Sequence, residues 1–499
     1  CNLPPACYAT QNLLSWYPSG SSGLFGAFYA WGLLASSYKG YRNWTMNYTL
    51  AVDQGTHASR ALVLDTQGQV ISQSLRAVAL AHPRPGWVEQ DAVQLAASVQ
   101  AAIREALHTL TAHQRAAVSA CGISSQRSTV LAWRANGTPV SPAINWQDTR
   151  GEPQLKSVRS RAAVIHKLSG LPLSAHYGAS KLHWLHQLLG NDPDVTLGPL
   201  ASFLLGNLTG DGRCVVDHSN AQRMQLFDIR TLNWSRQLLD WFDIPIDSLP
   251  VCLPVRHNYG TLSEYGIPVT AVCGDQNAAW FGSGEPDAGS ARVNLGSGAF
   301  ILARQANDHA IPNLLSSIAD SDAHGCQYLV EGTVNGSGNA LQWLTAYTSV
   351  QNIQSRLAVW LEQVSRPPLF LNTVGGLGSP WWKQGLAAKF VPDSNQYSDA
   401  ERTVAVAEST LFLVNYNLEQ IRKRQAILRL AVSGGLSRIK PLCQKLANLS
   451  GLPVERNEDA EASARGIAWL AAGRPRNWCQ TGRTQLFEPL SDTGLTARY

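Results

Sequence analysis

Apolar and polar positions in the first part of the chain alternate in short runs that predict strands. Residues 49–53, 60–65 and 70–74 are short apolar runs separated by turn residues, which is typical of strands joined by hairpins. Apolar residues at helical spacing follow over 92–112, and 117–123 is a strand-like run again. The predicted order of three strands, a helix and a strand differs from the strand–helix–strand start of a dinucleotide-binding domain.

A similar order returns in the second half of the chain. Residues 290–298 predict a strand that runs into a glycine-rich turn, and 299–303 predict the next strand. A long helix is predicted over 404–421, followed by a strand over 428–433 that ends at two glycines. Two halves with the same order indicate an internal duplication in an α/β protein.

A cluster of turn-forming residues at 282–286 marks the seam between the two halves. We therefore expect one domain over 46–284, a second over 285–475, and a tail over 476–499. Halves of this kind commonly close over a cleft, so a catalytic site is expected between them.

Residues 1–45 differ from the rest in composition. They are rich in Tyr, Ser, Gly and Leu, the first basic residue is Lys39 and the first methionine is Met46. The apolar stretch 23–37 is shorter than a typical membrane-spanning helix, and no basic segment precedes it as in a signal peptide. We expect 1–45 to be a non-native or disordered extension, with a membrane or targeting segment as the alternative.

Composition and charge limit the class of protein. The chain has 499 residues, of which 44% are hydrophobic and 15% charged, with a net charge of +5. These values are ordinary for a globular protein. The basic excess is slight and forms no block of like charge, so neither nucleic acid nor a membrane is expected as a partner.

The cysteines are scattered along the chain and none forms a CxxC pair. This spacing argues against a disulfide framework or a zinc site and favours a reduced, cytoplasmic compartment. The nine cysteines are Cys1, Cys7, Cys121, Cys214, Cys252, Cys273, Cys326, Cys443 and Cys479.

The turn after the first predicted strand carries groups suited to phosphate chemistry. Asp53 ends the strand, where a carboxylate can hold Mg²⁺ directly or through water. Gly55 permits a tight turn whose N–H groups can approach a phosphate. Thr56 and Ser59 add hydroxyl donors, and Arg60 adds a positive charge. Taken alone, an ordinary polar turn explains the segment better.

Two further glycine turns follow strands in the second half. Gly296 and Ser297 form a turn of the same kind as the first, and a triphosphate needs contacts at both ends. Gly434 and Gly435 follow another strand, where the missing side chains let the backbone pack flat against a planar group such as adenine. Such turns are also common without any ligand.

An aspartate lies where a predicted strand becomes a helix. The apolar run 267–273 is followed by Gly274, Asp275 and Gln276. A carboxylate in this place can accept the proton of a substrate hydroxyl as general base. It could equally be the N-cap of the following helix.

The order of these turns and Asp275 along the chain resembles the FGGY family of carbohydrate kinases, and within it the glycerol kinases most closely. The resemblance runs from about residue 48 to 473. Each further matching piece is modest, but their common register makes chance a poor explanation. The pieces are 85–91 (PGWVEQD), 122–127 (GISSQR), 146–150 (WQDTR), 331–332 (EG), 342–344 (QWL), 376–382 (GLGSPWW) and 461–468 (EASARGIA).

The resemblance implies an α/β, two-domain, actin-like ATPase fold of the ribonuclease H-like type, with the catalytic cleft between the domains and ATP and Mg²⁺ as cofactors. It implies that Asp275 is the general base, that Asp53 organises Mg²⁺, and that Thr56, Ser59 and Arg60 face the transferred phosphate. It places the nucleotide at Gly296, Ser297, Gly338, Gln342, Gly434 and Gly435. It places the polyol at Arg127, Ser128, Trp146, His176, Tyr177, Asp275 and Gln276.

The aromatic face of Trp146 would suit the C–H side of a polyol, while polar groups bind its hydroxyls. A core tryptophan is the alternative.

The chain departs from the glycerol kinase pattern at four places. Ser128 stands where those enzymes have a glutamate that binds substrate hydroxyls, and a neutral hydroxyl cannot accept the same charge-assisted hydrogen bonds. His176 stands at the position of the pocket tyrosine. His57 and Ala58 replace two hydroxyl residues of the phosphate turn, and Ile439 replaces an asparagine that contacts nucleotide.

These observations predict an ATP-dependent kinase for a small polyol or sugar, with glycerol, giving glycerol 3-phosphate, as the leading substrate. A ketose such as xylulose or ribulose, or another polyol such as erythritol, is the alternative substrate. A non-catalytic sugar-binding regulator on the same fold, or an actin-like chaperone or filament ATPase, are alternatives of other classes. A homodimer or homotetramer is compatible with the prediction.

Overall fold

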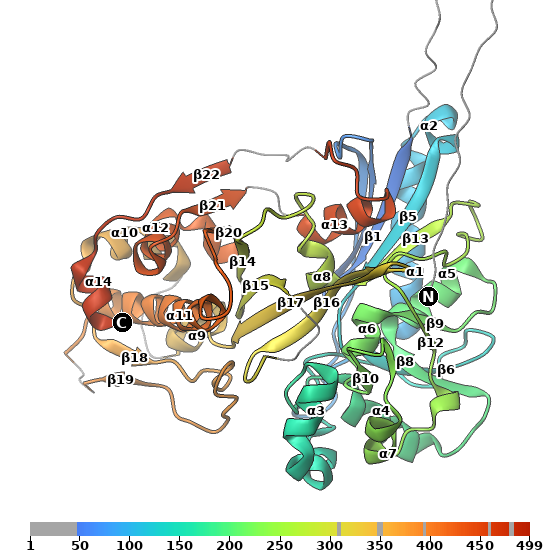
Figure 1. The fold of residues 1–499 in the computed structure, drawn as a ribbon, viewed down its shortest axis with the longest axis horizontal. Helices are drawn as coiled ribbons and strands as arrows, with labels where there is room; N and C mark the ends of the chain where they lie inside the picture. Colours follow the sequence, from blue (N-terminus) through green and yellow to red (C-terminus); the bar gives the residue numbers. More distant parts are fainter. Residues whose placement is uncertain (1–46, 307–310, 347–352, 393–395, 458–460, 479–483) are drawn as a thin grey trace, which may run out of the picture. The chain divides into compact units, whose positions relative to one another are not determined.

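The computed structural model describes residues 47–306, 311–346, 353–392, 396–457, 461–478 and 484–499. Residues 46–499 form one compact unit (Figure 1). It contains both strands and helices, as predicted for an α/β protein. The prediction that residues 1–45 are an extension lies outside the described residues.

The first sheet has five strands in the order β13-β5-β1-β2-β3. Strands β1, β2 and β3 are joined by antiparallel hairpins, whereas β1, β5 and β13 are parallel. The carboxyl ends of these three parallel strands therefore meet at one edge of the sheet. The strands, which confirm those predicted from the apolar runs, are β1 (Tyr48–Gln54), β2 (Ala58–Leu64), β3 (Val70–Ala77), β5 (Val118–Ser125) and β13 (Val269–Gly274).

One face of the first sheet packs against α1 (Ala92–His108) and α5 (Leu200–Thr209). Val52 of the sheet and Val99 of α1 belong to the same buried core. Helix α1 confirms the helix predicted over 92–112, although it ends earlier.

The opposite face packs against α13 (Ala462–Ala471), which comes from near the end of the chain (Figure 1). The approach is so close that two positions require glycine. A Cβ on Gly122 would lie 2.6 Å from a backbone oxygen of α13. A Cβ on Gly466 would overlap the backbone oxygen of Ala278. By its packing α13 belongs to the first half, although its sequence position lies in the predicted second domain, 285–475.

The second sheet has seven strands in the order β16-β17-β15-β14-β20-β21-β22. One face packs against α11 (Asp399–Arg422), which contains the helix predicted over 404–421, and against α12 (Lys440–Ser450). The strands, three of which confirm predicted ones, are β14 (Ser290–Leu295), β15 (Ala299–Gln305), β16 (Leu315–Asp322), β17 (Gly325–Val334), β20 (Arg429–Ser433), β21 (Val454–Asn457) and β22 (Thr484–Phe487).

The segment predicted as a tail, 476–499, is partly built into the second half. Strand β22 pairs antiparallel with β21 at the edge of the sheet. Helix α14 (Thr493–Arg498) docks through Arg498, whose Nη2 lies 2.7 Å from Oε1 of the buried Glu408. These residues therefore belong to the second half rather than to a separate tail.

Shorter elements complete both halves and form a four-stranded sheet, β4-β7-β6-β8, and three two-stranded ones. The remaining strands are β4 (Glu89–Gln90), β6 (Val130–Arg134), β7 (Ala143–Ile144), β8 (Val195–Pro199), β9 (Val215–Asp217), β10 (Phe227–Asp228), β11 (Asn233–Trp234), β12 (Val251–Leu253), β18 (Leu369–Leu371) and β19 (Lys389–Val391). The remaining helices are α2 (Ala112–Ala116), α3 (Ala162–Ser169), α4 (Gly178–Leu189), α6 (His218–Gln222), α7 (Arg236–Phe242), α8 (Asp275–Ala279), α9 (Gly338–Thr345) and α10 (Ile353–Gln363).

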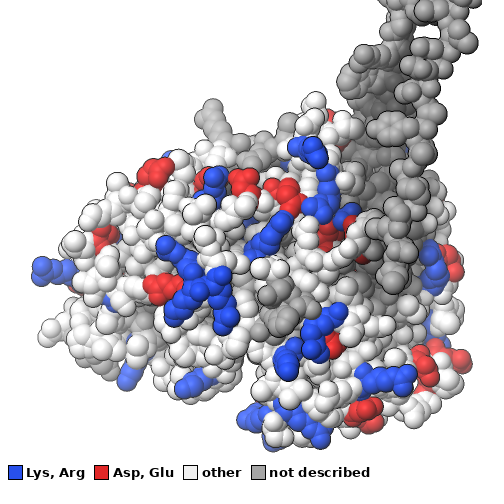
Figure 2. Space-filling view, in the orientation of Figure 1, with Lys and Arg blue, Asp and Glu red and all other residues white. Residues whose placement is uncertain are grey.

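The surface carries both signs of charge. Basic and acidic side chains are interspersed over the face shown in Figure 2. In the part of the chain that the structure describes, no helix has the length and apolar content needed to cross a bilayer.

Candidate active site

Asp53 lies at the edge where the parallel strands of the first sheet end. Its carboxylate is buried and accepts a hydrogen bond from Ser124 Oγ at 2.6 Å. Arg60 Nη1 lies 3.7 Å from Asp53 Oδ2 but only 2.8 Å from Glu461 Oε2. Burial raises the pKa of Asp53 from its ordinary 3.8 to about 6; the Ser124 hydrogen bond opposes the rise, and the charge of Asp275 adds to it.

Replacing Asp53 by Asn should stabilise the protein without ligands at pH 8. Because folding raises the pKa of Asp53, its stabilising contribution is complete below about pH 4 and is lost as the pH rises through about 6. The asparagine oxygen can still accept from Ser124, so the variant should gain about 1–3 kcal/mol at pH 8 and less than about 1 kcal/mol at pH 4. Thermal unfolding in Mg²⁺-free buffer measures both values. A variant less stable than wild type at pH 8 would contradict this account.

Thr56, in the turn after β1, is joined directly to Trp146. The Trp146 indole Nε1 donates to Thr56 Oγ1 at 3.0 Å, and Gln90 Nε2 donates to the Thr56 backbone oxygen at 3.0 Å. Gln90 is one of four buried amide side chains that share hydrogen bonds behind the turn; they are Gln54, Gln90, Gln126 and Asn145. The phosphate-type turn and the aromatic wall are therefore held by one polar network.

Not every residue predicted to face the transferred phosphate lies at the edge of the sheet where Asp53 is found. Ser59 is fully buried, and its hydroxyl lies 2.7 Å from the Ser98 hydroxyl of α1, on the far side of the strand. The expectation that Ser59 faces the phosphate is therefore not supported. His57 is exposed at the tip of the turn.

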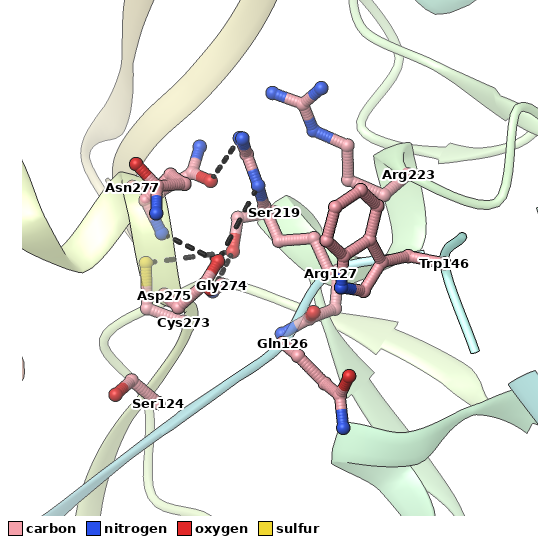
Figure 3. A network of polar contacts seen from close by, with 12 residues as sticks. Ser124, Gln126, Arg127, Trp146, Ser219, Arg223, Cys273, Gly274, Asp275 and Asn277 are labelled. Atoms are coloured by element: carbon pink, nitrogen blue, oxygen red, sulfur yellow. Dashed lines mark hydrogen bonds and ion pairs between the residues drawn. The ribbon is translucent and has the colours of Figure 1, made fainter. Parts of the chain in front are cut away.

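Asp275 is the first residue of α8, directly after β13. Helix α8 has Gly274 as its N-cap, so Asp275 is not the capping residue; its Oδ1 instead accepts the Gln276 N–H at 2.7 Å. The Gly274 N–H donates to Ser219 Oγ at 2.8 Å, which fixes the turn (Figure 3). Burial raises the pKa of Asp275, while Arg127 opposes the rise. A half-buried carboxylate with a raised pKa suits a proton acceptor.

Arg127 lies beside Asp275 in the turn between β5 and β6. Arg127 Nε is 3.6 Å from Asp275 Oδ1, and Arg127 Nη1 donates to Asn277 Oδ1 at 2.9 Å (Figure 3). Its side chain packs on Gly274, where a Cβ would lie 2.7 Å from Arg127 Cγ. Arg127 is therefore held beside Asp275 by contacts with both Asn277 and Gly274.

Two residues that were not predicted from the sequence join this cluster. Arg127 Nη1 also donates to Glu331 Oε1 at 3.1 Å, and Glu331 accepts from Arg223 Nη2 as well. Glu331 had appeared only as part of a matching piece without a role, and nothing in the local sequence of Arg223 marks it. Their meeting depends on tertiary packing, in which α6 lies against β16 and β16 pairs with β17. The sequence pattern does not reveal this packing.

The aromatic residues predicted to line the polyol site lie next to one another. The ring centroids of Trp146 and His176 lie 5.5 Å apart, and those of His176 and Tyr177 lie 5.1 Å apart. His176 is exposed and Tyr177 is buried. Ser128 has a left-handed backbone (φ 63°), and its buried hydroxyl has no hydrogen-bond partner among the described residues. Ser128 thus offers an unused donor and acceptor beside Arg127.

The turn at Gly296 and Ser297, predicted to bind nucleotide, is hydrogen-bonded to the start of α9. The Gly338 N–H donates to the Gly296 oxygen and the Asn339 N–H to the Ser297 oxygen, both at 2.9 Å, so the β14–β15 turn lies against the start of α9. Gln342 is exposed on α9. These residues therefore present backbone and polar groups on one surface.

Gly434 and Gly435 line a cavity of about 830 Å³, to which Gln276, Asn294 and Ala462 also contribute. Gly434 needs to be glycine, since its φ is 91° and a Cβ would lie 2.6 Å from the Leu295 oxygen. A Cβ on Gly435 would meet no atom within 4 Å, so this backbone is open to a ligand.

The departure at Ile439 has a structural counterpart. Ile439 packs against the core of the second half, which is lined by residues of α11 and α12. It therefore adds an apolar group rather than an amide next to the glycine turn.

The residues present fit a magnesium ion shared with a nucleotide. Within the described ranges, no group of three or more His, Cys, Asp or Glu side chains could hold a metal by itself. Asp53 nevertheless offers a carboxylate whose nearest cation, Arg60 Nη1, lies at 3.7 Å, beyond hydrogen-bond distance, and the charge of Asp275 adds to the negative field. Mg²⁺ usually takes one or two carboxylates together with water and substrate phosphates.

Comparisons with known proteins identify the family and the relatives of this chain. The models of the N-terminal and C-terminal domains of the FGGY family of carbohydrate kinases match residues 48–282 and 291–473. The chain is 32% identical to a glycerol kinase of Leptothrix cholodnii over 453 residues, which cover 85% of this chain and 90% of the relative. It is 33% identical to a glycerol kinase of Acidovorax ebreus, with the same coverage.

Solved structures show the same fold. A Plasmodium falciparum glycerol kinase with ADP has a TM-score of 0.81 at 23% identity, covering 91% of this chain and 97% of that one. A ligand-bound xylulose kinase from Lactobacillus acidophilus has a TM-score of 0.79 at 19% identity, covering 91% and 96%. This likeness confirms the predicted two-domain, actin-like ATPase fold, and with the family models and curated relatives it follows that the chain belongs to the FGGY family of carbohydrate kinases.

Proposed function

We propose that this protein is an ATP- and Mg²⁺-dependent kinase that phosphorylates glycerol to glycerol 3-phosphate. The convergence of Asp53, Arg127 and Asp275 at one edge of the first sheet carries the proposal, because it puts a metal-type carboxylate, a cation and a base side by side. The substrate rests on the curated relatives named glycerol kinase. The cytoplasmic compartment and the oligomeric state stay predictions.

The proposed reaction uses few protein groups. A hydroxyl of the acceptor attacks the terminal phosphorus of ATP, the new oxygen–phosphorus bond forms, and the bond to the ADP oxygen breaks. Asp275 accepts the proton of the attacking hydroxyl, Arg127 orients the acceptor, and Thr56 lies where its N–H and hydroxyl can approach the transferred group. Bound Mg²⁺ would neutralise charge on the phosphates.

Two features favour a different acceptor as the second candidate. Ser128 stands where glycerol kinases have a glutamate that accepts hydrogen bonds from the substrate hydroxyls. His176 stands where they have a tyrosine. Both lie in the proposed polyol pocket, so a ketose or a longer polyol such as erythritol is the alternative substrate. The retained carboxylates Asp53 and Asp275 support a catalyst over a non-catalytic regulator.

A coupled assay of ADP release with Mg·ATP tests the proposal on the full chain. Glycerol, erythritol, xylulose and ribulose are compared under one condition, and kcat/KM should be highest for glycerol. A higher kcat/KM for a ketose or for erythritol would identify that compound, rather than glycerol, as the preferred substrate. Binding of these compounds without turnover would indicate a non-catalytic sugar-binding regulator. ATP hydrolysis at the same rate with and without all four compounds would indicate another actin-like ATPase.

A further inference from the structure

Glu331 is a buried anion that joins the acceptor pocket to the second sheet. It lies on β17 and is 1% exposed. A single oxygen, Oε1, accepts from Arg127 Nη1 at 3.1 Å, from Ser317 Oγ at 2.6 Å and from Arg223 Nη2. Arg223 is itself 2% exposed and also donates to Ser317 Oγ at 2.6 Å. Both arginines are therefore fixed by one carboxylate.

Glu331 is ionised at neutral pH. Burial alone would raise its pKa, but Arg223, Arg127 and the Ser317 hydrogen bond outweigh burial and lower the pKa to about 2. Arg127 thus has two anionic neighbours: Glu331, with a direct hydrogen bond, and Asp275, at 3.6 Å.

The two neighbours compete for the same guanidinium. A direct hydrogen bond between Arg127 and Asp275 would occupy the proposed base and lower its basicity. Glu331, together with Asn277 at 2.9 Å, holds Nη1 of Arg127, while Nε lies 3.6 Å from Asp275 Oδ1, beyond hydrogen-bond distance. An acceptor hydroxyl can then reach the Asp275 carboxylate while Arg127 stays beside it.

We infer that Glu331 is a positioning residue for acceptor binding: through the Arg127–Glu331–Arg223 bridge it keeps Arg127 from closing on the proposed base. The inference rests on the proposed function, since it takes Arg127 and Asp275 as acceptor-binding groups. It also makes acceptor binding depend on β17, a strand of the sheet that carries the nucleotide turn Gly296–Ser297.

The test is the variant Glu331→Gln, measured by steady-state kinetics and by calorimetric binding of glycerol without nucleotide. The acceptor KM and Kd should rise about 10- to 100-fold, as expected for the loss of hydrogen bonds to a charged group. The KM for ATP should change less than about 3-fold, because the nucleotide turns are untouched. An unchanged acceptor KM and Kd would overturn the inference.

Two further variants separate positioning from stability. Glu408→Gln is the matched control, since Glu408 is also 1% exposed and bridges two cations, Lys445 at 3.1 Å and Arg498 at 2.7 Å. It should lower the thermal midpoint without changing the acceptor KM. Glu331→Gln with Arg223→Gln removes the unpaired cation, so the midpoint should recover while the acceptor KM stays high. If the acceptor KM of this double variant returned to the wild-type value, Glu331 would serve only to neutralise Arg223, and the inference that it positions Arg127 would be wrong.

The wild-type protein separates the inference from the proposed function. If it phosphorylates another acceptor of the panel instead of glycerol, the same variants are measured with that acceptor, and only the substrate changes. If it neither binds nor phosphorylates any member of the panel, both the proposed function and the inference fall.

Discussion

The variant Asp275→Asn should bind glycerol with near-normal affinity and lose at least about 100-fold in kcat. Asparagine has the same shape and can still accept the Gln276 N–H, which donates to Asp275 Oδ1 at 2.7 Å. It cannot accept a proton from the acceptor hydroxyl. Calorimetric titration with glycerol gives the affinity, and the coupled assay gives kcat.

Asp247→Asn is the matched control, because Asp247 is exposed and distant in sequence from the cluster. Its kcat should equal that of wild type. If Asp275→Asn retained kcat within a few-fold, Asp275 would be removed from the base role. If it lost affinity and kcat together, its charge would be needed chiefly to hold Arg127, which lies 3.6 Å away.

The sequence was sufficient to predict the strands that lead into the site. The strands ending at Asp53 and before Asp275 are short apolar runs followed by polar or small residues, and this pattern depends only on local burial. Since parallel strands end at the same edge, the meeting of Asp53 and Asp275 follows once the sheet order is known. The apolar pattern does not give this order, which is known from the structure; the family resemblance implied only the fold.

Side-chain direction and contacts between residues far apart in sequence were not predicted correctly. Ser59 has the residue type expected at a phosphate turn, but strand alternation turns it toward Ser98 of α1. Arg223 and Glu331 are far apart in sequence, and only tertiary packing brings them to Arg127. The alternation of the β2 residues could have excluded Ser59; no local signal could have found Arg223.

Gly466 shows how a residue remote from the chemistry should control the site. Its variant Gly466→Ala would overlap the backbone oxygen of Ala278, and neither backbone can yield as a flexible side chain does. Helices α13 and α8 must then separate. Overpacking of this kind costs about 1–3 kcal/mol, so the thermal midpoint should fall.

Activity should fall further than stability alone explains, because α8 also carries Asp275 at its first residue. A displacement of about 1 Å at a reacting group can cost on the order of 100-fold in rate, so kcat should fall by that order in protein that is still folded. Gly206→Ala in α5 is the matched control: its Cβ would meet no atom within 4 Å, and alanine should stabilise that helix by about 1 kcal/mol. Circular dichroism melts and the coupled assay at a temperature well below both midpoints measure the two effects. If Gly466→Ala kept full kcat while losing stability, the contact between α13 and α8 would support the fold without positioning Asp275, the proposed base.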